Sequence, residues 1–305
     1  MTQNTPQQRS IGRATVQTAA QWLRPLKLAR FPWVRRIYAA VYRRTVPEGQ
    51  QVEVGLRGSR FLVDPHDGGV GYQLFIGRGY EDLTADVFES CMRPGMRVLD
   101  LGANIGFYSV LAAARVGPQG RVIAFEPAPE NVEILARNAK LNAFAQLEVV
   151  PSACSDKAER VTLRLNPRGK GLHTIGSAGA DWGRLEIDTI VLDEYFADES
   201  FCADFLKIDI EGAEERALSG MKRLIARSKS LQVLSEVNPT ALAANGSDAS
   251  TYLRRWRELG FEPRTVIDEA AGLVLTPSLG ELLALCERRP LEVKHWNCNV
   301  LLCRP

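Results

Sequence analysis

The sequence lacks the cysteine and histidine patterns that mark zinc sites or disulfide frameworks. No C-x-x-C pair and no Cys/His cluster occurs among its 305 residues. The six cysteines are scattered along the chain: Cys91, Cys154, Cys202, Cys286, Cys298 and Cys303. This distribution predicts reduced, mostly buried thiols and argues against a zinc site. We assign no metal ligand from the sequence.

Long apolar runs are also absent. No stretch approaches the roughly 20 apolar residues that a membrane-spanning helix needs. Residues 1–8 lack the charged start and apolar core of a signal peptide. Together these absences favour a cytoplasmic protein. The chain is 45% hydrophobic and 24% charged, which is typical of a globular protein with a buried core.

The net charge of +2 hides an uneven distribution. Residues 1–50 contain nine Lys or Arg residues and one Glu, so this arm is strongly basic. The rest of the chain therefore holds the other 29 of 38 basic residues against 35 of 36 acidic ones. An acidic body argues against a broad nucleic-acid footprint, which needs a basic face on the folded domain. We expect no nucleic-acid partner.

Residues 22–44 combine basic and aromatic side chains. Pro32 suits the first turn of a helix, and the apolar residues after it recur on one stripe: Trp33, Val34, Ile37, Tyr38, Val41 and Tyr42. Such a basic amphipathic helix can lie on an anionic membrane surface, including the inner membrane, or in a partner's groove. Alternatively, the stripe packs on the domain and the arginines are only solvated. The oligomeric state does not follow from the sequence.

Three segments are predicted: a basic arm over 1–50, a lead-in over 51–96 and a large domain over 97–305. Alternating apolar residues predict a β-hairpin over 51–64, followed by a helix over 82–92. From residue 97, strands and helices alternate, which favours a doubly wound α/β fold. The strands are expected at 97–102, 121–126, 147–151, 160–165, 185–191, 205–210, 231–237 and 297–303. The helices are expected at 105–116, from Pro129 onward, at 213–228 and at 248–259.

The segment 97–109 predicts a strand, a tight turn and a helix. Asp100 precedes the turn, and Gly102 and Gly106 are expected to let a ligand approach the backbone. Unpaired N–H groups at the start of a helix favour a carboxylate or a phosphate. The spacing lacks the G-x-G-x-x-G pattern of a dinucleotide site. It suits the amino-acid end of a methionine-type ligand, with the ammonium group near Asp100.

Two further strand ends extend this site. Glu126 ends the second strand about 20 residues after the glycine turn, where an acidic residue binds ribose hydroxyls in nucleotide folds. Pro127 fixes the exit of the chain. The exit of the third strand, at Ser152 and Ala153, borders the purine in a nucleoside site, although a plain surface loop explains it almost equally well.

Carboxylates gather at the end of the fourth strand, in the sequence Lys207-Ile-Asp-Ile-Glu-Gly-Ala-Glu214. Alternation places Lys207 and Asp209 on one face of that strand. Paired carboxylates can hold a metal or act as acid and base. Glu236 ends the fifth strand at the same crevice, whereas Glu214 suits a structural place in the first turn of a helix. His173, in a glycine-rich loop, is a further candidate base.

These segments resemble the FkbM-like S-adenosylmethionine-dependent methyltransferases. The matching motifs are Val98–Ser109, Val122–Pro127 with Glu130-Asn131, Asn142, Ala153–Asp156 and Lys207–Glu214. The resemblance covers about residues 51–240. It implies a class I (Rossmann-like) fold, a seven-stranded, mostly parallel sheet with helices on both faces and an antiparallel final strand. The loop Gly171-Leu-His-Thr174 departs from the serine-rich turn of relatives.

The resemblance also implies S-adenosyl-L-methionine as cofactor and O-methyl transfer to a sugar, glycan or natural-product hydroxyl. The loop around Gly102 would bind the cofactor, Glu126 its ribose, and Asp209 would lie at the site. Together with the turns described above, the predicted cofactor contacts are Asp100, Gly102, Ala103, Asn104, Gly106, Phe107, Glu126, Pro127, Ser152, Ala153 and Asp209. The candidate bases, in falling order, are Asp209, Glu236 and His173. The alternatives are an NAD-linked oxidoreductase and a non-catalytic nucleotide-binding module that uses the arm for contacts.

Overall fold

A computed structural model describes residues 47, 49–75, 80–166, 173–175, 182–198 and 200–305. The helix expected after Pro32 and the rest of residues 22–44 lie outside these residues. The chain forms two compact units, 1–80 and 81–305. The sequence analysis placed the helix over 82–92 in the lead-in segment 51–96. The corresponding helix, α4 (Asp82–Cys91), belongs instead to the second unit. Within the described ranges, every helix is too short or too polar to serve as a membrane-spanning segment.

The first unit contains the predicted hairpin. Strands β1 (Val52–Leu56) and β2 (Ser59–Val63) pair antiparallel and are followed by helix α3 (Val70–Phe75). The two-residue turn between the strands has positive φ at Arg57 and Gly58, 51° and 82°. Two positive φ angles suit the right-handed twist of a tight hairpin.

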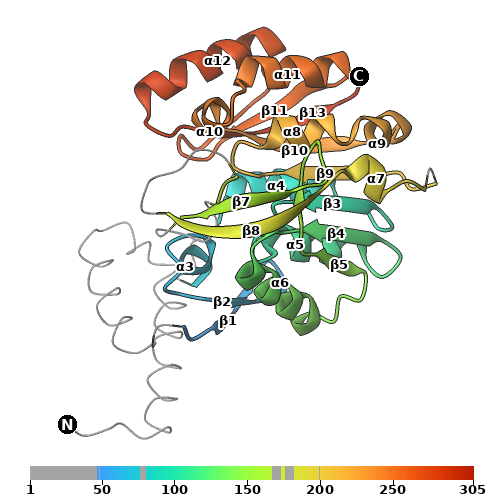
Figure 1. The fold of residues 1–305 in the computed structure, drawn as a ribbon, viewed down its shortest axis with the longest axis vertical. Coiled ribbons are helices and arrows are strands. Elements are labelled where there is room, and N and C mark those ends of the chain that lie inside the picture. Colours follow the sequence, from blue (N-terminus) through green and yellow to red (C-terminus); the bar gives the residue numbers. More distant parts are fainter. Residues whose placement is uncertain (1–46, 48, 76–79, 167–172, 176–181, 199) are drawn as a thin grey trace, which may run out of the picture. The chain divides into compact units, whose positions relative to one another are not determined.

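The second unit is built on an eight-stranded sheet with the order β12-β11-β13-β10-β9-β3-β4-β5 (Figure 1). Its strands are β3 (Arg97–Leu101), β4 (Arg121–Phe125), β5 (Leu147–Val150), β9 (Phe205–Ile208), β10 (Gln232–Val237), β11 (Glu262–Asp268), β12 (Leu273–Leu275) and β13 (Cys298–Cys303). The neighbouring strands β5, β4, β3, β9 and β10 are parallel to one another, and β13 pairs antiparallel with both β10 and β11. This confirms the expected mostly parallel sheet with an antiparallel final strand; the short β12 adds an eighth strand.

The strand order places a ligand crevice between β3 and β9. From β3 the chain builds outward to β4 and β5, then returns to the other side of β3 at β9. Since such crossovers are right-handed, helices on the two sides of this switch cover opposite faces of the sheet. Ligands of open α/β sheets bind at the carboxyl ends of the strands at such a switch.

The helices of the second unit largely follow the predicted alternation. They are α4, α5 (Phe107–Val116), α6 (Pro129–Leu141), α7 (Leu192–Tyr195), α8 (Glu214–Ser219), α9 (Lys222–Arg227), α10 (Pro239–Ala244), α11 (Ala249–Glu258) and α12 (Leu279–Glu292). A small sheet of order β6-β8-β7 lies outside the main one, with β6 (Ala153–Cys154), β7 (Arg160–Leu165) and β8 (Gly183–Ile190).

The prediction of a single helix over 213–228 is wrong. The chain instead forms α8 and α9, which are separated at Gly220 and Met221. A Cβ atom at Gly220 would lie 2.1 Å from the carbonyl oxygen of Ser155. The close approach of the Ser155 backbone therefore requires glycine at the break between the two helices.

The core of the second unit continues into the C-terminal region, where the sequence analysis expected only the helix over 248–259 and the strand over 297–303. Trp256 of α11 and Trp296 before β13 are both buried, at 0% and 2% exposure. They belong to the cluster that also contains Leu206 and Val233 of the central strands. The C-terminal elements therefore form part of the same hydrophobic core as the strands that carry the site.

Candidate functional site

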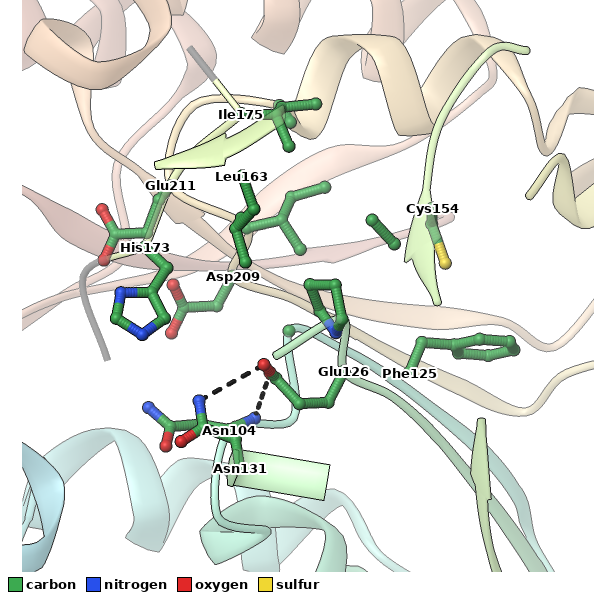
Figure 2. Close-up of a pocket in the computed structure, with 15 residues that line it drawn as sticks. Asn104, Phe125, Glu126, Asn131, Cys154, Leu163, His173, Ile175, Asp209 and Glu211 are labelled. Carbon is green, nitrogen blue, oxygen red and sulfur yellow. Dashed lines mark hydrogen bonds between the residues drawn. The ribbon is translucent and has the colours of Figure 1, made fainter. Parts of the chain in front are cut away.

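A pocket opens at the carboxyl ends of β3, β4 and β9 and encloses about 580 Å³, part of it open to solvent (Figure 2). Its lining residues are Gly102, Asn104, Phe125, Glu126, Pro127, Asn131, Ala153, Cys154, Leu163, His173, Ile175, Asp209, Ile210, Glu211 and Ala213. Seven of the predicted site residues are among them: Gly102, Asn104, Glu126, Pro127, Ala153, His173 and Asp209. The others do not line it: Asp100, Ala103, Gly106, Phe107, Ser152 and Glu236.

The two glycines of the turn are required by contacts within the chain. Gly102 has φ +79°, and a Cβ there would lie 1.8 Å from the carbonyl oxygen of Asp209. Gly106 has φ +88°, and its Cβ would lie 2.2 Å from Cδ1 of Leu135 on α6. These contacts give an additional reason for glycine: the turn crosses the Asp209 backbone and packs against α6. Gly102 also lines the pocket, and the approach of a ligand to this turn stays a prediction.

The N–H groups of this turn are already hydrogen-bonded. All five backbone N–H groups of residues 102–106 donate within the chain. Two donate to the carbonyl oxygen of Phe125 at 3.0 Å, and one donates to Oε2 of Glu126 at 2.8 Å. The N–H of Ile105 donates to Oδ1 of Asn104 at 2.7 Å, and the N–H of Gly106 donates to the carbonyl oxygen of Ala103 at 2.8 Å. The expectation of unpaired N–H groups for an anion is therefore wrong for these residues.

Glu126 is a buried carboxylate held by three donors. Its Oε2 accepts from the N–H of Asn104, and its Oε1 accepts from the N–H of Ala128 at 2.9 Å and from Asn131 Nδ2 at 3.2 Å (Figure 2). Burial raises the pKa of Glu126 to about 7, although these hydrogen bonds act in the opposite direction. The three donors fix the orientation of the carboxylate, and Oε2 keeps acceptor capacity for a hydroxyl group.

Asp100 lies in the interior rather than at the crevice. It is 2% exposed, and its Oδ2 accepts a hydrogen bond of 2.6 Å from Ser109 Oγ. Its Oδ1 is buried and has no donor within the part of the chain that is described. Burial raises the pKa of Asp100. The expectation that this side chain faces a ligand in the crevice is wrong, because it packs against the first turn of α5.

Lys207 and Asp209 form an ion pair, which agrees with the prediction that they lie on one face of the strand. Lys207 is 3% exposed, its Nζ lies 3.1 Å from Oδ2 of Asp209, and it lies over the Tyr108 ring at 4.6 Å. Burial alone would lower the pKa of Lys207, but the carboxylates of Asp209 and Asp100 raise it. The lysine is therefore charged and positions Asp209 at the edge of the pocket.

Glu211 lies in the turn after β9 with a left-handed backbone, φ 52°. Its carbonyl oxygen accepts from Thr174 Oγ1 at 2.8 Å and from Asn245 Nδ2 at 3.4 Å, which holds the turn in place. Burial and the negative charge of Asp209 raise the pKa of Glu211 well above its usual range. Sequence reasoning had discussed Glu211 but assigned it no role.

Glu214 and Glu236 have different surroundings. Glu214 Oε1 accepts from the N–H groups of Ile210 and Gly212, as suits the structural place expected for it. Glu236 ends β10, is 7% exposed and accepts a hydrogen bond from Asn297 Nδ2. Burial and the charge of Asp209 raise the pKa of Glu236 well above its usual range. Glu236 thus lies beside Asp209 without lining the pocket.

His173 lies on the wall of the pocket near Asp209 and Glu211 (Figure 2). Its Nδ1 accepts a hydrogen bond of 3.1 Å from the N–H of Asn166. The ring therefore lines the pocket with one nitrogen bonded to the backbone, and its role as a candidate base stays a prediction.

Several lining residues were missed by sequence reasoning. Leu163 of β7 and Ile175 supply an apolar wall from a segment whose loops gave no motif. Asn131 was part of a quoted motif but received no role. Its position five residues after Glu126, in the first turn of α6, is the signal that could have identified it as a partner of that carboxylate.

Comparison with known proteins places this pocket in a family. A family model described as the methyltransferase FkbM domain matches residues 100–263, more than half of the chain and a span that contains every lining residue. The chain belongs to the FkbM methyltransferase family. This membership does not favour the NAD-linked oxidoreductase or the non-catalytic module.

The individual relatives match a smaller part of this chain than the family model does. Methyltransferase sdnD of Sordaria araneosa is 32% identical over 155 residues, 41% of this chain and 60% of that protein. Protein-L-isoaspartate O-methyltransferase 1 of Arabidopsis thaliana is 32% identical over 88 residues, 28% of this chain and 37% of that protein. The match with this chain therefore covers less than two thirds of the length of each of these two relatives. A solved structure of Aeropyrum pernix fibrillarin shares 10% identity with a TM-score of 0.41, covering 84% of each chain.

Proposed function

We propose that this FkbM-family chain transfers a methyl group from S-adenosyl-L-methionine to a hydroxyl oxygen of a sugar, glycan or natural-product acceptor. The observation that carries the proposal is one pocket, within the matched span 100–263, with a fixed carboxylate at one end and a pocket-lining carboxylate at the other. These carboxylates are Glu126 and Asp209.

The residues present fit most of this cofactor. Leu163, Ile175 and Phe125 offer apolar surface to a purine ring, and Oε2 of Glu126 can accept from a ribose hydroxyl. The donors for the carboxylate of the cofactor are not the N–H groups of residues 102–106, because those are already bonded within the chain.

When bound, the cofactor supplies a sulfonium methyl group that is already activated for transfer. The protein's own task is then to position an acceptor oxygen in line and to receive its proton. Asp209 is the leading candidate base because it lines the pocket and is paired with the charged Lys207. Glu236 lies behind it, and His173 lines the pocket as a further candidate base.

The proposal is tested by incubating the full chain with S-adenosylmethionine and a panel of sugar and natural-product alcohols, followed by mass spectrometry. A mass gain of one methylene on an acceptor that carries only hydroxyl groups is expected. Asp209→Asn should lower turnover by about a hundredfold or more while cofactor affinity changes little. Transfer confined to nitrogen, sulfur or carbon would contradict the choice of oxygen, and an unchanged turnover would remove Asp209 as the base.

A further inference from the structure

Three carboxylates from three places in the fold converge beside the pocket. Asp209 follows β9, Glu211 lies in the next turn, and Glu236 ends β10. One side-chain oxygen from each lies within 4.8 Å of the corresponding oxygens of the other two. In the pocket view, Asp209 and Glu211 lie on the same side as His173 (Figure 2). Convergence alone does not define a site, because acidic groups often gather without a ligand.

A second observation points to a missing partner. Glu236 is more than nine-tenths buried, and one of its carboxylate oxygens accepts from Asn297. Its other oxygen, Oε2, is fully buried and has no hydrogen-bond donor among the residues that the structure describes. Withdrawing a carboxylate oxygen from water without a donor is costly, so such atoms are normally paired or bind a metal.

Few cationic groups among the described residues contact the cluster. Within the described ranges, the recorded ion pair of this cluster is the one from Lys207 to Oδ2 of Asp209, at 3.1 Å. No described residue donates a recorded hydrogen bond to the carboxylate of Glu211, and Glu214 adds negative charge nearby. One lysine therefore faces three converging carboxylates.

We propose that Asp209, Glu211 and Glu236 form a binding site for one hard divalent cation, such as Mg²⁺, Mn²⁺ or Ca²⁺. Carboxylate oxygens are the ligands these ions prefer, and metal–oxygen distances of roughly 2.0–2.6 Å place opposite ligands about 4–5 Å apart. The spread of the three oxygens is compatible with that geometry. This site departs from the sequence analysis, which assigned no metal ligand.

The position of the site suggests its use. Two of its three ligands line the pocket, so a bound ion would be accessible to an oxygen of a second molecule in that pocket. A hydroxyl bound to such an ion is more acidic, and its oxygen is held in place. This use rests on the proposed oxygen methyl transfer, whereas ion binding itself does not.

Manganese binding tests the site directly. The full chain, freed of metal by a chelator, is titrated with Mn²⁺, and electron paramagnetic resonance follows the free ion, with and without saturating S-adenosylhomocysteine. We expect one ion per chain under both conditions, displaced by Mg²⁺ or Ca²⁺. Glu236→Gln and Glu211→Gln should each weaken binding by about tenfold or more. Glu287→Gln, at an exposed position of α12, is the matched control and should bind as the wild type does.

Calorimetry with S-adenosylhomocysteine on every variant shows that the pocket is intact, and if Glu236→Gln does not fold, Glu211→Gln carries the test. No binding of Mn²⁺ at millimolar concentration, or equal binding by both cluster variants and the wild type, would overturn the proposal. Displacement of Mn²⁺ by S-adenosylhomocysteine would also overturn it, and would assign the cluster to the ammonium group. If the chain binds S-adenosylhomocysteine but no ion, the proposed metal site is wrong and the proposed function is not affected. If the chain binds the ion but not S-adenosylhomocysteine, the proposed function is wrong and the metal site is not affected.

Discussion

The two ends of the pocket differ in how their carboxylates are held. At the end formed by β3 and β4, the five N–H groups of residues 102–106 and both oxygens of Glu126 have partners within the chain. At the end formed by β9, Glu236 of the neighbouring β10, which lies beside Asp209 without lining the pocket, keeps a buried oxygen without a described donor. The carboxylate at the first end is therefore fixed by the chain itself, whereas the carboxylates at the second can take a further partner.

This difference gives the two ends of the pocket different roles. The closed end, residues 102–126, uses backbone packing and hydrogen bonds to hold one carboxylate in one orientation, which suits recognition of an invariant ligand. The open end, Asp209, Glu211 and Glu236, concentrates charge that only a cation, a proton or a substrate group can offset. We infer that the methyl donor is held at the closed end and that the acceptor meets the open end.

The largest expected effect comes from breaking the closed end. Gly102→Ala forces a Cβ against the carbonyl oxygen of Asp209, at a φ that other residues rarely adopt. We expect a loss of about 4 kcal/mol or more in the free energy of unfolding, because two backbones must separate. Urea denaturation followed by circular dichroism measures the loss.

Gly95→Ala provides the matched control. Gly95 has φ +83°, close to that of Gly102, but no atom lies within 4 Å of its Cβ position. Gly95→Ala should lower the free energy of unfolding by only about 1–2 kcal/mol, which is the backbone penalty alone. Equal losses at Gly95 and Gly102 would show that the close approach of the Asp209 backbone contributes nothing to stability.

A smaller effect concerns the titration of Glu126. Its pKa is about 7 in the folded chain, above the ordinary value of 4.5, so the folded state binds more protons between these two values. Stability from this group is therefore present at low pH and is lost as the pH rises toward 7. Glu126→Gln should reduce the fall in unfolding free energy between about pH 5 and about pH 8 by roughly 1–3 kcal/mol.

Unfolding curves at several pH values measure this slope for the wild type and the variant. Glu148→Gln, an exposed position on β5, is the control and should leave the slope unchanged. A slope in Glu126→Gln equal to that of the wild type would mean that the pKa of Glu126 is near its ordinary value in the folded chain.

Much of the central fold could be predicted from the sequence because its signals are local. Short apolar runs ending at Asp100, Glu126 and Asp209, with helical periodicity between them, predicted the parallel strands and their order along the chain. Gly220 shows where local signals fail. The break in the periodic helix lies where Gly220 contacts the backbone of Ser155, which is 65 residues earlier in the chain, and no local pattern records such a contact.

The elements between the predicted helix at 248–259 and the predicted strand at 297–303 were missed for a different reason. This segment carries no motif of the site, and β12 exposes its apolar residues. A usable signal was present at α12, where Ser278 and Glu281 form a capping box that marks a helix start. Pro290, which lies inside that helix, argues locally against it, and burial of Leu282 on the core shows how packing overrides that penalty.

Within the site, the sequence predicted which residues gather but not where each side chain points. Asp209 lines the pocket, whereas Asp100, also at a strand end, packs on Ser109 inside. The residue type is the same, but Asp100 lies within β3 in register with Lys207, whereas Asp209 follows the end of β9. Asp209 therefore lies closer to the crevice, and the register between the two strands, which depends on the whole fold, decides which carboxylate lines the pocket.

The central claim is that the closed end of the pocket binds the nucleoside of a methyl donor through Glu126. Calorimetric titration with S-adenosylhomocysteine of the wild type, Glu126→Ala and the control Glu287→Ala tests it most directly. The account predicts stoichiometric binding by the wild type and the control, and a loss of about a hundredfold in affinity for Glu126→Ala. Unchanged affinity in a folded Glu126→Ala, or no binding by the wild type, would contradict it.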